Sequence, residues 1–264
     1  LFSQKEISIV KYSAVENSDY HAKNISVSNG KMVFDVHSPN GNIVGAELCM
    51  AGNHNISNAI ACISVSQLMG LSNDIDSFLL EQQICLKNNE NYFDELKKII
   101  HALIKARDKK FKIFTIGNGG SGSTASHFVS DLIKTASVKE KNKFSAFSLV
   151  DNIPVILAWS NDSSFDNIFS EQLKNHLSKN DIIIAFSGSG NSKNILNALK
   201  YGKSLGATCI GFTGKSGGKM KKLCDICLQI PSSNMLTIES IHSVLCHCIV
   251  DSIRKTGTPL FKYE

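Results

Sequence analysis

The sequence predicts a doubly wound α/β fold, with a five-stranded parallel sheet flanked by helices and preceded by a small antiparallel β segment and one helix. Short apolar runs near residues 111–116, 145–149, 181–186, 207–212 and 226–230 are typical of buried strands. Helices are predicted between these runs, and alternating strands and helices favour a parallel sheet. Two of the strands end in Gly/Ser loops, at the sheet edge where such folds bind ligands.

The first fifty residues are predicted to form antiparallel strands, because apolar and polar side chains alternate over residues 7–12, 24–28, 31–36 and 42–49. The pair Asn29-Gly30 between two of these segments is a strong hairpin signal. A helix is expected over residues 56–69, where apolar side chains recur at helical spacing.

A polar-capped helical region is predicted over residues 73–108. Ser72 or Asn73 can cap its start, and the polar run 88–91 is expected to interrupt it. Residues 1–72 and 73–264 are therefore predicted to be two domains. The last helix is expected over residues 234–254.

The stretch 111–134 places a Gly/Ser loop between a strand and a helix. Its loop, Gly117-Asn118-Gly119-Gly120-Ser121, forms a turn that only small residues allow. The free N–H groups at the start of the following helix suit an oxyanion or a sugar hydroxyl. His127 and Asp131 lie four residues apart on this helix, so they share a face.

A second loop of the same kind, SGSGNS at residues 187–192, follows the strand 181–186 and precedes a helix over 194–205. Its serine hydroxyls and backbone N–H groups converge at one helix start, which is typical of a phosphate site. One such turn alone is more often a tight strand-to-helix connection. Two in one chain, each after a buried strand, favour a ligand site.

The composition is that of a globular chain: 264 residues, 42% hydrophobic and 19% charged, enough for one core and a small additional unit. The net charge of +5 includes no long basic run, so no nucleic-acid partner is expected. No apolar run approaches membrane-spanning length, and no signal peptide is expected. Because the chain begins at Leu1, it is open to being part of a longer protein.

Eight cysteines are scattered along the chain, mostly in apolar segments, as reduced core thiols are. This usage predicts a reducing, cytoplasmic location. Cys224-Asp225-Ile226-Cys227 is a single CxxC motif without a second pair at zinc spacing, so the sequence favours a structural role for it.

The two loops, together with three other segments, give the sequence a resemblance to the sugar isomerase (SIS) domain. These segments are Ser160-Asn161-Asp162, residues 212–220 (FTGKSGGKM) and residues 238–247 (IESIHSVLCH). Within SIS proteins the sequence most resembles the phosphoheptose isomerases, which interconvert sedoheptulose 7-phosphate and a manno-heptose 7-phosphate. The resemblance covers about residues 75–264, and it implies a homotetramer in which the N-terminal helices and the last helix pack subunits together.

Aldose–ketose isomerisation moves a proton between C1 and C2 through an enediol, so it needs an acid/base pair, stabilised enediol oxygens and a phosphate anchor. The resemblance implies that His127, Asp131, Glu239 and His247 serve as zinc ligands and as that pair. The family has His, Glu, Gln and His at these positions, so Asp131 is one methylene shorter and Glu239 adds a charge. All four can still bind Zn²⁺, and Asp131, Glu239 and His247 are the catalytic candidates.

Glu239 and His247 lie on the same predicted helix. At a rise of roughly 1.5 Å per residue they are about 12 Å apart along its axis, which is far for two ligands of one metal ion. The site is therefore predicted to draw on more than one subunit. Taken alone, a histidine placed as His247 is, between Cys246 and Cys248, is more often a core residue than a ligand. The resemblance instead favours a functional role for His247.

The resemblance also implies substrate contacts. Ser187, Ser189 and Ser192 are expected to hold the phosphate, while Asn118, Ser121 and Asp162 are expected to contact the sugar. Gly188 stands where the family usually has Thr, so one hydroxyl contact is missing. The predicted substrate-binding residues are Asn118, Gly119, Gly120, Ser121, Asn161, Asp162, Ser187, Gly188, Ser189 and Ser192.

Residues 19–71 resemble the Mur ligases, and most closely the UDP-N-acetylmuramate–alanine ligases, through GNHNISNAIACISV at 52–65. In that family the residues matching His54, Asn55 and Asn58 lie by the ATP nucleotide. ATP use there needs a G-x-x-x-x-G-K-[ST] loop. The one Gly-Lys-Ser, at 214–216, has Cys209 where the first glycine should stand, so ligase activity is not expected and His54 is predicted to be a turn or capping residue.

The sequence thus predicts a sugar-phosphate aldose–ketose isomerase of the phosphoheptose class that uses Zn²⁺. One alternative is a non-catalytic SIS module that senses a sugar phosphate or acts as a scaffold. Another is an isomerase of a different sugar phosphate. Ligand-capable side chains at all four positions of the predicted metal site favour an enzyme over a scaffold.

Overall fold

The computed structural model describes residues 12–13, 18–28, 31–39, 41–48, 56, 58–63, 72–87 and 90–261. The pattern of contacts divides the chain into two units, residues 1–80 and 81–264, with the boundary inside helix α2 (Ser72–Lys87). The predicted domain boundary at residue 72 lies at the start of this helix and stays a prediction.

The smaller unit contains a four-stranded sheet in the order β1-β2-β3-β4, formed by Tyr12–Ser13, Tyr20–Ser28, Lys31–His37 and Ile43–Leu48. Strands β2, β3 and β4 are antiparallel, as predicted, whereas the short β1 pairs parallel with β2. Ser28 lies opposite Lys31, the register that a two-residue hairpin connection gives. Tyr20, Phe34 and Ile60 are among its fully buried side chains.

Several predictions for this unit lie outside the described residues: the strand over 7–11, the Asn29-Gly30 turn, and His54 and Asn55. Of the predicted helix over 56–69, the described residues 56 and 58–63 are helical. The described part of the unit therefore supports the predicted β segment and helix.

The larger unit is built on a five-stranded parallel sheet in the order β6-β5-β7-β8-β9, which confirms the predicted fold class. Its strands are β5 (Lys112–Gly117), β6 (Ser145–Ser148), β7 (Ile182–Ser187), β8 (Thr208–Thr213) and β9 (Ile226–Gln229). The central strand β7 is buried along its whole length, because helices cover both faces of a parallel sheet. The carboxyl ends of β5 and β7 are therefore adjacent, and both lead into Gly/Ser loops.

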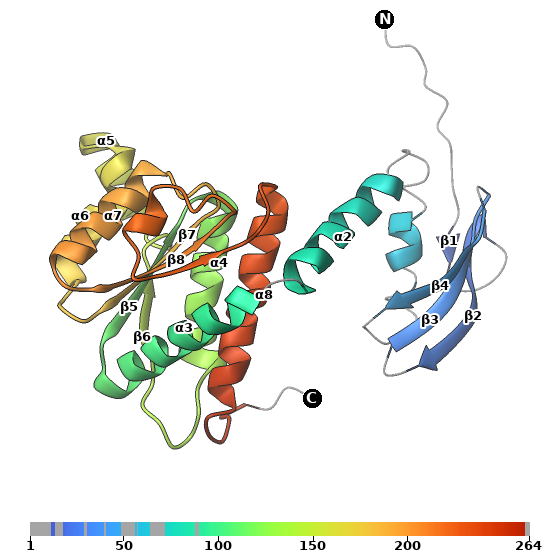
Figure 1. Ribbon diagram of the computed structural model, residues 1–264, viewed down its shortest axis with the longest axis horizontal. Helices are drawn as coiled ribbons and strands as arrows, with labels where there is room; N and C mark the ends of the chain where they lie inside the picture. Colours follow the sequence, from blue (N-terminus) through green and yellow to red (C-terminus); the bar gives the residue numbers. More distant parts are fainter. Residues whose placement is uncertain are drawn as a thin grey trace, which may run out of the picture. The chain divides into compact units, whose positions relative to one another are not determined.

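Helices form a layer on each face of this sheet (Figure 1). One layer contains α3 (Glu90–Lys109), α4 (Gly119–Ser130) and α8 (Met235–Arg254), and the other contains α5 (Ile153–Asp162), α6 (Ile168–His176) and α7 (Lys193–Ser204). Successive strand residues alternate between the two cores, so Ile182 and Ile184 pack under the first layer and Ile183 under the second.

The start of α8 is fixed by Glu81 of α2. Its carboxylate accepts hydrogen bonds from Ser232 Oγ at 2.6 Å, Thr237 Oγ1 at 2.9 Å and Asn234 Nδ2 at 3.2 Å. These bonds, led by that of Ser232, lower the pKa of Glu81 against the opposing effect of burial. The contact matters for the site because α8 carries Glu239 and His247.

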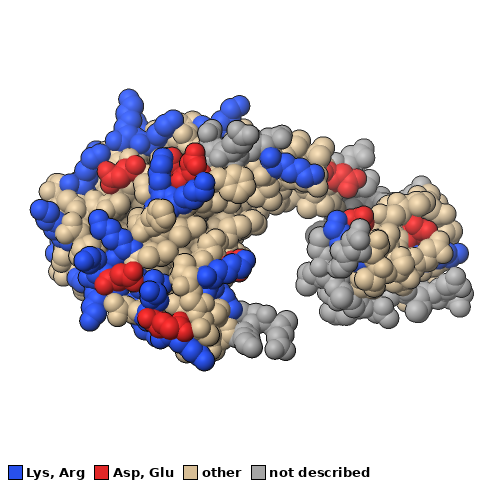
Figure 2. Space-filling model, turned by 60° about the horizontal axis from the view of Figure 1, so that its bottom comes forward, with Lys and Arg blue, Asp and Glu red and all other residues tan. Residues whose placement is uncertain are grey.

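The surface of the larger unit mixes both signs of charge. Figure 2 shows Lys and Arg side chains spread over the visible face with Asp and Glu among them. Among the described residues, α8 is the one helix long and apolar enough by composition to suit a membrane span. Its side chains Ile238, Ile241 and Leu245 are instead part of the core of this unit, which accounts for its apolar character.

Candidate active site

The first Gly/Ser loop turns the chain from β5 into α4 through close backbone contacts. A Cβ atom on Gly117 would lie 2.4 Å from the carbonyl oxygen of Ser121, so a larger residue does not fit there. Gly119 begins α4 with a positive φ of 54°, a conformation that favours glycine. The sequence folds in this way locally because small residues occupy each tight position, and the turn leaves the start of α4 open beside the sheet edge.

A pair of asparagines joins the two loops. Asn118 Nδ2 donates to Asn194 Oδ1 at 3.0 Å, and Asn194 Nδ2 donates back to Asn118 Oδ1 at 2.8 Å. Asn194 is buried in the first turn of α7, where its Oδ1 also accepts from the N–H of Ile195. Sequence analysis did not single out Asn194, which lies two residues after the SGSGNS loop, because no local signal marks its pairing with Asn118. The pair holds the ends of β5 and β7 in one arrangement.

The second loop, residues 187–192, packs against the glycine-rich segment 214–218. Gly190 has a φ of 62°, and a Cβ atom on it would lie 2.3 Å from the carbonyl oxygen of Gly217. Ser192 is the N-cap residue of α7, and Ser189 is exposed. Ser187 is buried at the end of β7. Ser189 and Ser192 therefore lie at the start of α7, and the role of the loop as a phosphate site stays a prediction.

Residues of α8 fill the space that a side chain at position 188 would occupy, so only glycine fits there. A Cβ atom on it would lie 2.3 Å from Met235 Sδ and 3.5 Å from Ile238 Cγ2. Met235 thus occupies the volume that the threonine usual in the family would need at this position. The loop therefore lacks the hydroxyl group of that threonine, and the thioether group of Met235 lies over the loop instead.

Three of the four predicted metal ligands converge. Asp131 Oδ2 lies 3.7 Å from His127 Nε2 and 3.5 Å from His247 Nε2. The two imidazole rings meet edge to face with centroids 5.0 Å apart, and one ligand atom from each of the three residues lies within 4.8 Å of the others. The Asp131 side chain is 14% exposed, whereas those of the two histidines are more than half exposed. The cluster is therefore open to solvent on the histidine side.

Asp131 stands where α4 changes into a π turn, Asp131–Thr135, in which the N–H of Ala136 donates to the carbonyl of Asp131 at 2.7 Å. Such turns occur often at functional sites. The wider turn also changes the register of the side chains. Leu132 is buried, whereas Ile133, the next residue, is 49% exposed.

Glu239, the fourth predicted ligand, lies apart from this cluster. Its Oε1 accepts a hydrogen bond from Ser121 Oγ at 3.2 Å, and its carboxylate covers Gly120, where a Cβ atom would lie 2.2 Å from Glu239 Oε2. Glu239 and His127 both line a hollow of about 310 Å³ at the start of α4. The additional carboxylate thus faces the first Gly/Ser loop instead of the two histidines.

A cavity of about 690 Å³ lies at the same end of the sheet. Asn118, Gly119 and His127 line it, together with Phe165 from the segment after α5. The residues of the second loop do not line this cavity, and neither do Asn161 and Asp162. Within one chain, the first loop and His127 of the cluster therefore open into one space, and the second loop is their neighbour.

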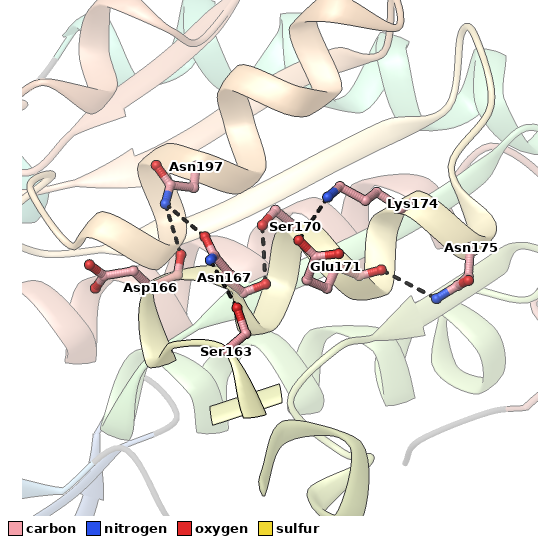
Figure 3. Close-up of polar contacts among 8 residues, drawn as sticks. All are labelled: Ser163, Asp166, Asn167, Ser170, Glu171, Lys174, Asn175 and Asn197. Atoms are coloured by element: carbon pink, nitrogen blue, oxygen red, sulfur yellow. Dashed lines mark hydrogen bonds and ion pairs between the residues drawn. The ribbon is translucent and has the colours of Figure 1, made fainter. Parts of the chain in front are cut away.

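Asn161 and Asp162 are exposed at the end of α5, where Asn161 Nδ2 donates to Asp162 Oδ1 at 2.7 Å. A polar network ties the segment after them to α7, the helix that begins at the second loop (Figure 3). Asn197 of α7 donates to Asp166 O at 3.0 Å and to Asn167 Oδ1 at 3.3 Å, which positions the turn that carries Phe165. The other contacts drawn are Asn167 with Ser163, Ser170 with Asn167, Lys174 with Glu171, and Asn175 with Glu171.

The larger unit defines the class of the protein. The SIS domain model matches residues 81–214. The structure of a phosphoheptose isomerase from Francisella tularensis aligns with a TM-score of 0.64 and 27% sequence identity, covering 72% of this chain and 98% of that chain. The chain is a SIS-domain protein.

Curated relatives narrow this class to one family. The phosphoheptose isomerase of Helicobacter pylori (strain P12) is 35% identical over 178 residues, which are 67% of this chain and 92% of the relative. That of Aliarcobacter butzleri (strain RM4018) is 36% identical over 180 residues, which are 68% of this chain and 94% of the relative. The chain belongs to the phosphoheptose isomerase family. The Mur ligase middle domain model matches residues 1–66, so both predicted resemblances are confirmed.

Proposed function

We propose that the protein interconverts sedoheptulose 7-phosphate and D-glycero-D-manno-heptose 7-phosphate in the cytoplasm, by proton transfer through an enediol. The observation that carries this proposal is the convergence of His127, Asp131 and His247 beside a Gly/Ser loop. Membership of the phosphoheptose isomerase family supplies the reaction class. A sugar phosphate is the substrate class that a cavity, an acid/base group and a serine loop at one sheet edge would serve.

The histidine cluster fits a zinc ion. Two imidazole nitrogens and one carboxylate oxygen are the donor types that Zn²⁺ prefers, and three protein ligands are typical of catalytic zinc sites. We therefore assign His127, Asp131 and His247 as the ligands, with Glu239 outside the set. A bound Zn²⁺ would supply a Lewis acid that polarises the carbonyl group of the substrate.

Glu239 is the proposed proton carrier, because Asp131 is engaged between the two histidines. The Ser121 hydroxyl orients the Glu239 carboxylate, which lies at the start of α4 in a hollow shared with His127. A carboxylate in this position can take the proton from one carbon of the bound sugar and return it to the other. The N–H groups at the start of α4 would stabilise the enediol oxygens.

The second loop is the proposed phosphate anchor, with Ser187, Ser189 and Ser192 as hydroxyl donors. We expect Ser192→Ala to raise the KM for sedoheptulose 7-phosphate by about tenfold, because the loss of a hydrogen bond to a charged group costs roughly 1.5 kcal/mol. The kcat should change less, since the variant leaves the reacting carbons untouched. An unchanged KM in steady-state kinetics would exclude this placement of the phosphate.

We propose a homotetramer with sites shared between subunits. Apolar side chains are exposed on α2, α5 and α8, including Leu79, Leu157 and Leu236, and a partner subunit would bury them. Light scattering at micromolar concentration should give the mass of four chains, and a monomeric mass would reject the proposal.

The decisive test is metal analysis of the purified protein followed by turnover of sedoheptulose 7-phosphate. Stoichiometric zinc and turnover that a chelator abolishes are expected. A protein that binds no metal and is inactive on every sugar phosphate tried would favour the scaffold alternative. We propose that residues 1–72 are a ligase-like central-domain segment, since the Mur ligase middle domain model matches residues 1–66.

A further inference from the structure

The CxxC motif lies where β9 begins, at the edge of the parallel sheet. Cys224 follows the 3₁₀ turn Met220–Lys222, and Cys227 is in β9. Both thiols are free and half-buried, and both adjoin Gly211 of β8: Cys227 is its partner in the sheet, and Cys224 Sγ lies against it. The sequence alone favoured a structural role, but two free thiols beside the same residue are also an arrangement from which a disulfide forms.

The two thiols differ in their surroundings. Cys227 lines a cavity of about 380 Å³ that Lys221 and Glu95 also line, so a small solute can reach its sulfur. Cys224 faces the sheet, where a Cβ atom on Gly211 would lie 2.7 Å from its Sγ. The outer thiol is therefore accessible and the inner thiol is placed behind it.

The electrostatics give the two thiols different chemical roles. The neighbouring Cys224 thiol and then the charge of Lys221 lower the pKa of the Cys227 thiol, against the effect of burial. The Cys227 thiol and burial raise the pKa of the Cys224 thiol. Because the thiolate is the reactive form, Cys227 is the nucleophile of the pair.

A metal site does not account for the pair. Among the residues that the structure describes, His127, Asp131 and His247 are the one group of three or more metal-binding side chains at coordinating distances. In the described part of the chain, no third metal-binding side chain lies at coordinating distance from the two cysteines, whereas a structural zinc site needs four. The local chemistry therefore points to thiol oxidation.

We propose that Cys224 and Cys227 form a reversible oxidation site for peroxides, with Cys227 as the attacking thiol and Cys224 as the resolving thiol. The Cys227 sulfur attacks one oxygen of hydrogen peroxide, the O–O bond breaks, and hydroxide leaves, which gives a sulfenic acid. The Cys224 sulfur then attacks the Cys227 sulfur, the S–O bond breaks, and the departing hydroxide leaves as water with the thiol proton. Two thiols are oxidised to one disulfide and one peroxide is reduced to two waters.

Oxidation at this site would be transmitted to the second Gly/Ser loop. The N–H of Cys224 donates to Met220 O at 3.1 Å, and the N–H of Met220 donates to Gly190 O at 2.9 Å. The N–H of Lys219 donates to Asn191 Oδ1 at 3.1 Å. A disulfide would tie Cys224 covalently to β9, and we expect the turn that carries Cys224 to shift when it forms. These bonds to the loop then weaken.

The test uses the full chain, reduced with dithiothreitol, freed of reductant and exposed to equimolar hydrogen peroxide. Remaining thiols are alkylated and the peptides are weighed. We expect the peptide that contains both cysteines to lose two hydrogens and to regain them with dithiothreitol. Amide exchange of Met220 and Cys224, which does not depend on activity, should be several-fold faster in the oxidised protein.

Two variants separate the roles of the thiols. Cys224→Ser should stop at the sulfenic acid of Cys227, which a 1,3-dione traps, and Cys227→Ser should slow oxidation of residue 224 by about tenfold or more. Cys62→Ser, which removes an exposed cysteine of the smaller unit, should oxidise as the wild type does. The proposal is overturned if both cysteines remain alkylatable after peroxide, if Cys224→Ser traps no sulfenic acid at Cys227, or if the pair binds stoichiometric zinc that blocks oxidation.

Discussion

His247→Asn is expected to lower kcat for sedoheptulose 7-phosphate by about a hundredfold to ten-thousandfold, the range that loss of a proton-transfer or metal-binding group gives. His247 is exposed on α8 and contacts Asp131 across the π turn, so its replacement should leave the core intact. Asn keeps a polar side chain of similar size but removes the imidazole nitrogen. Zinc content measured on the same sample should fall with kcat.

Substitutions of Asp131 provide the matched control. Asp131→Asn removes the charge between the two histidines and should reduce kcat nearly as much as His247→Asn. Asp131→Glu restores the residue that the family has here, and it should retain or improve activity because the carboxylate remains. Wild-type activity in all three variants, with the wild-type protein active, would show that the site is elsewhere.

The strands and loops of the larger unit were predictable because their signals are local. Each strand is an apolar run, and each ligand loop follows from glycine and serine at a strand end. His127 and Asp131 share a face because they are one helical turn apart, which sequence spacing gives directly. The family resemblance added His247, whose position on α8 brings it to Asp131.

What the sequence could not predict depends on partners far along the chain or on irregular backbone. The Asn118–Asn194 pair joins residues of two different loops, and neither residue type carries a local signal for it. The π turn that begins at Asp131 departs from the regular helical period, and sequence spacing gives no sign of it. Helix spacing gave the distance between Glu239 and His247, but not that Glu239 faces Ser121.

A second large effect is expected at His242, a residue of α8 that the proposed reaction does not use. His242 is fully buried between Phe186 and Phe212, with ring centroids 6.0 and 5.8 Å away. Burial lowers the pKa of its imidazole to about 4, with a weaker opposite effect of the contact to the Thr213 carbonyl. Its Nδ1 has no hydrogen-bond partner in the described part of the chain.

The direction of the pH dependence follows from the pKa of His242 in the unfolded and in the folded protein. The unfolded chain takes up a proton on this imidazole below about pH 6.5, whereas the folded protein keeps it neutral down to about pH 4. Stability that is present at neutral pH is therefore lost as the pH falls through this window. Between about pH 6.5 and pH 5 the loss is about 2 kcal/mol from this residue.

We expect His242→Leu to remove that part of the acid sensitivity. Leucine fills a similar volume without titrating, and the Thr213 carbonyl keeps the N–H of Ile230 as its donor at 2.8 Å. Urea unfolding at about pH 7.5 and about pH 5 should show a decrease in the free energy of unfolding that is smaller in the variant by about 2 kcal/mol. His101→Gln, at an exposed position of α3, should keep the wild-type dependence. Equal acid sensitivity of wild type and His242→Leu would mean that the buried imidazole is not the group that titrates.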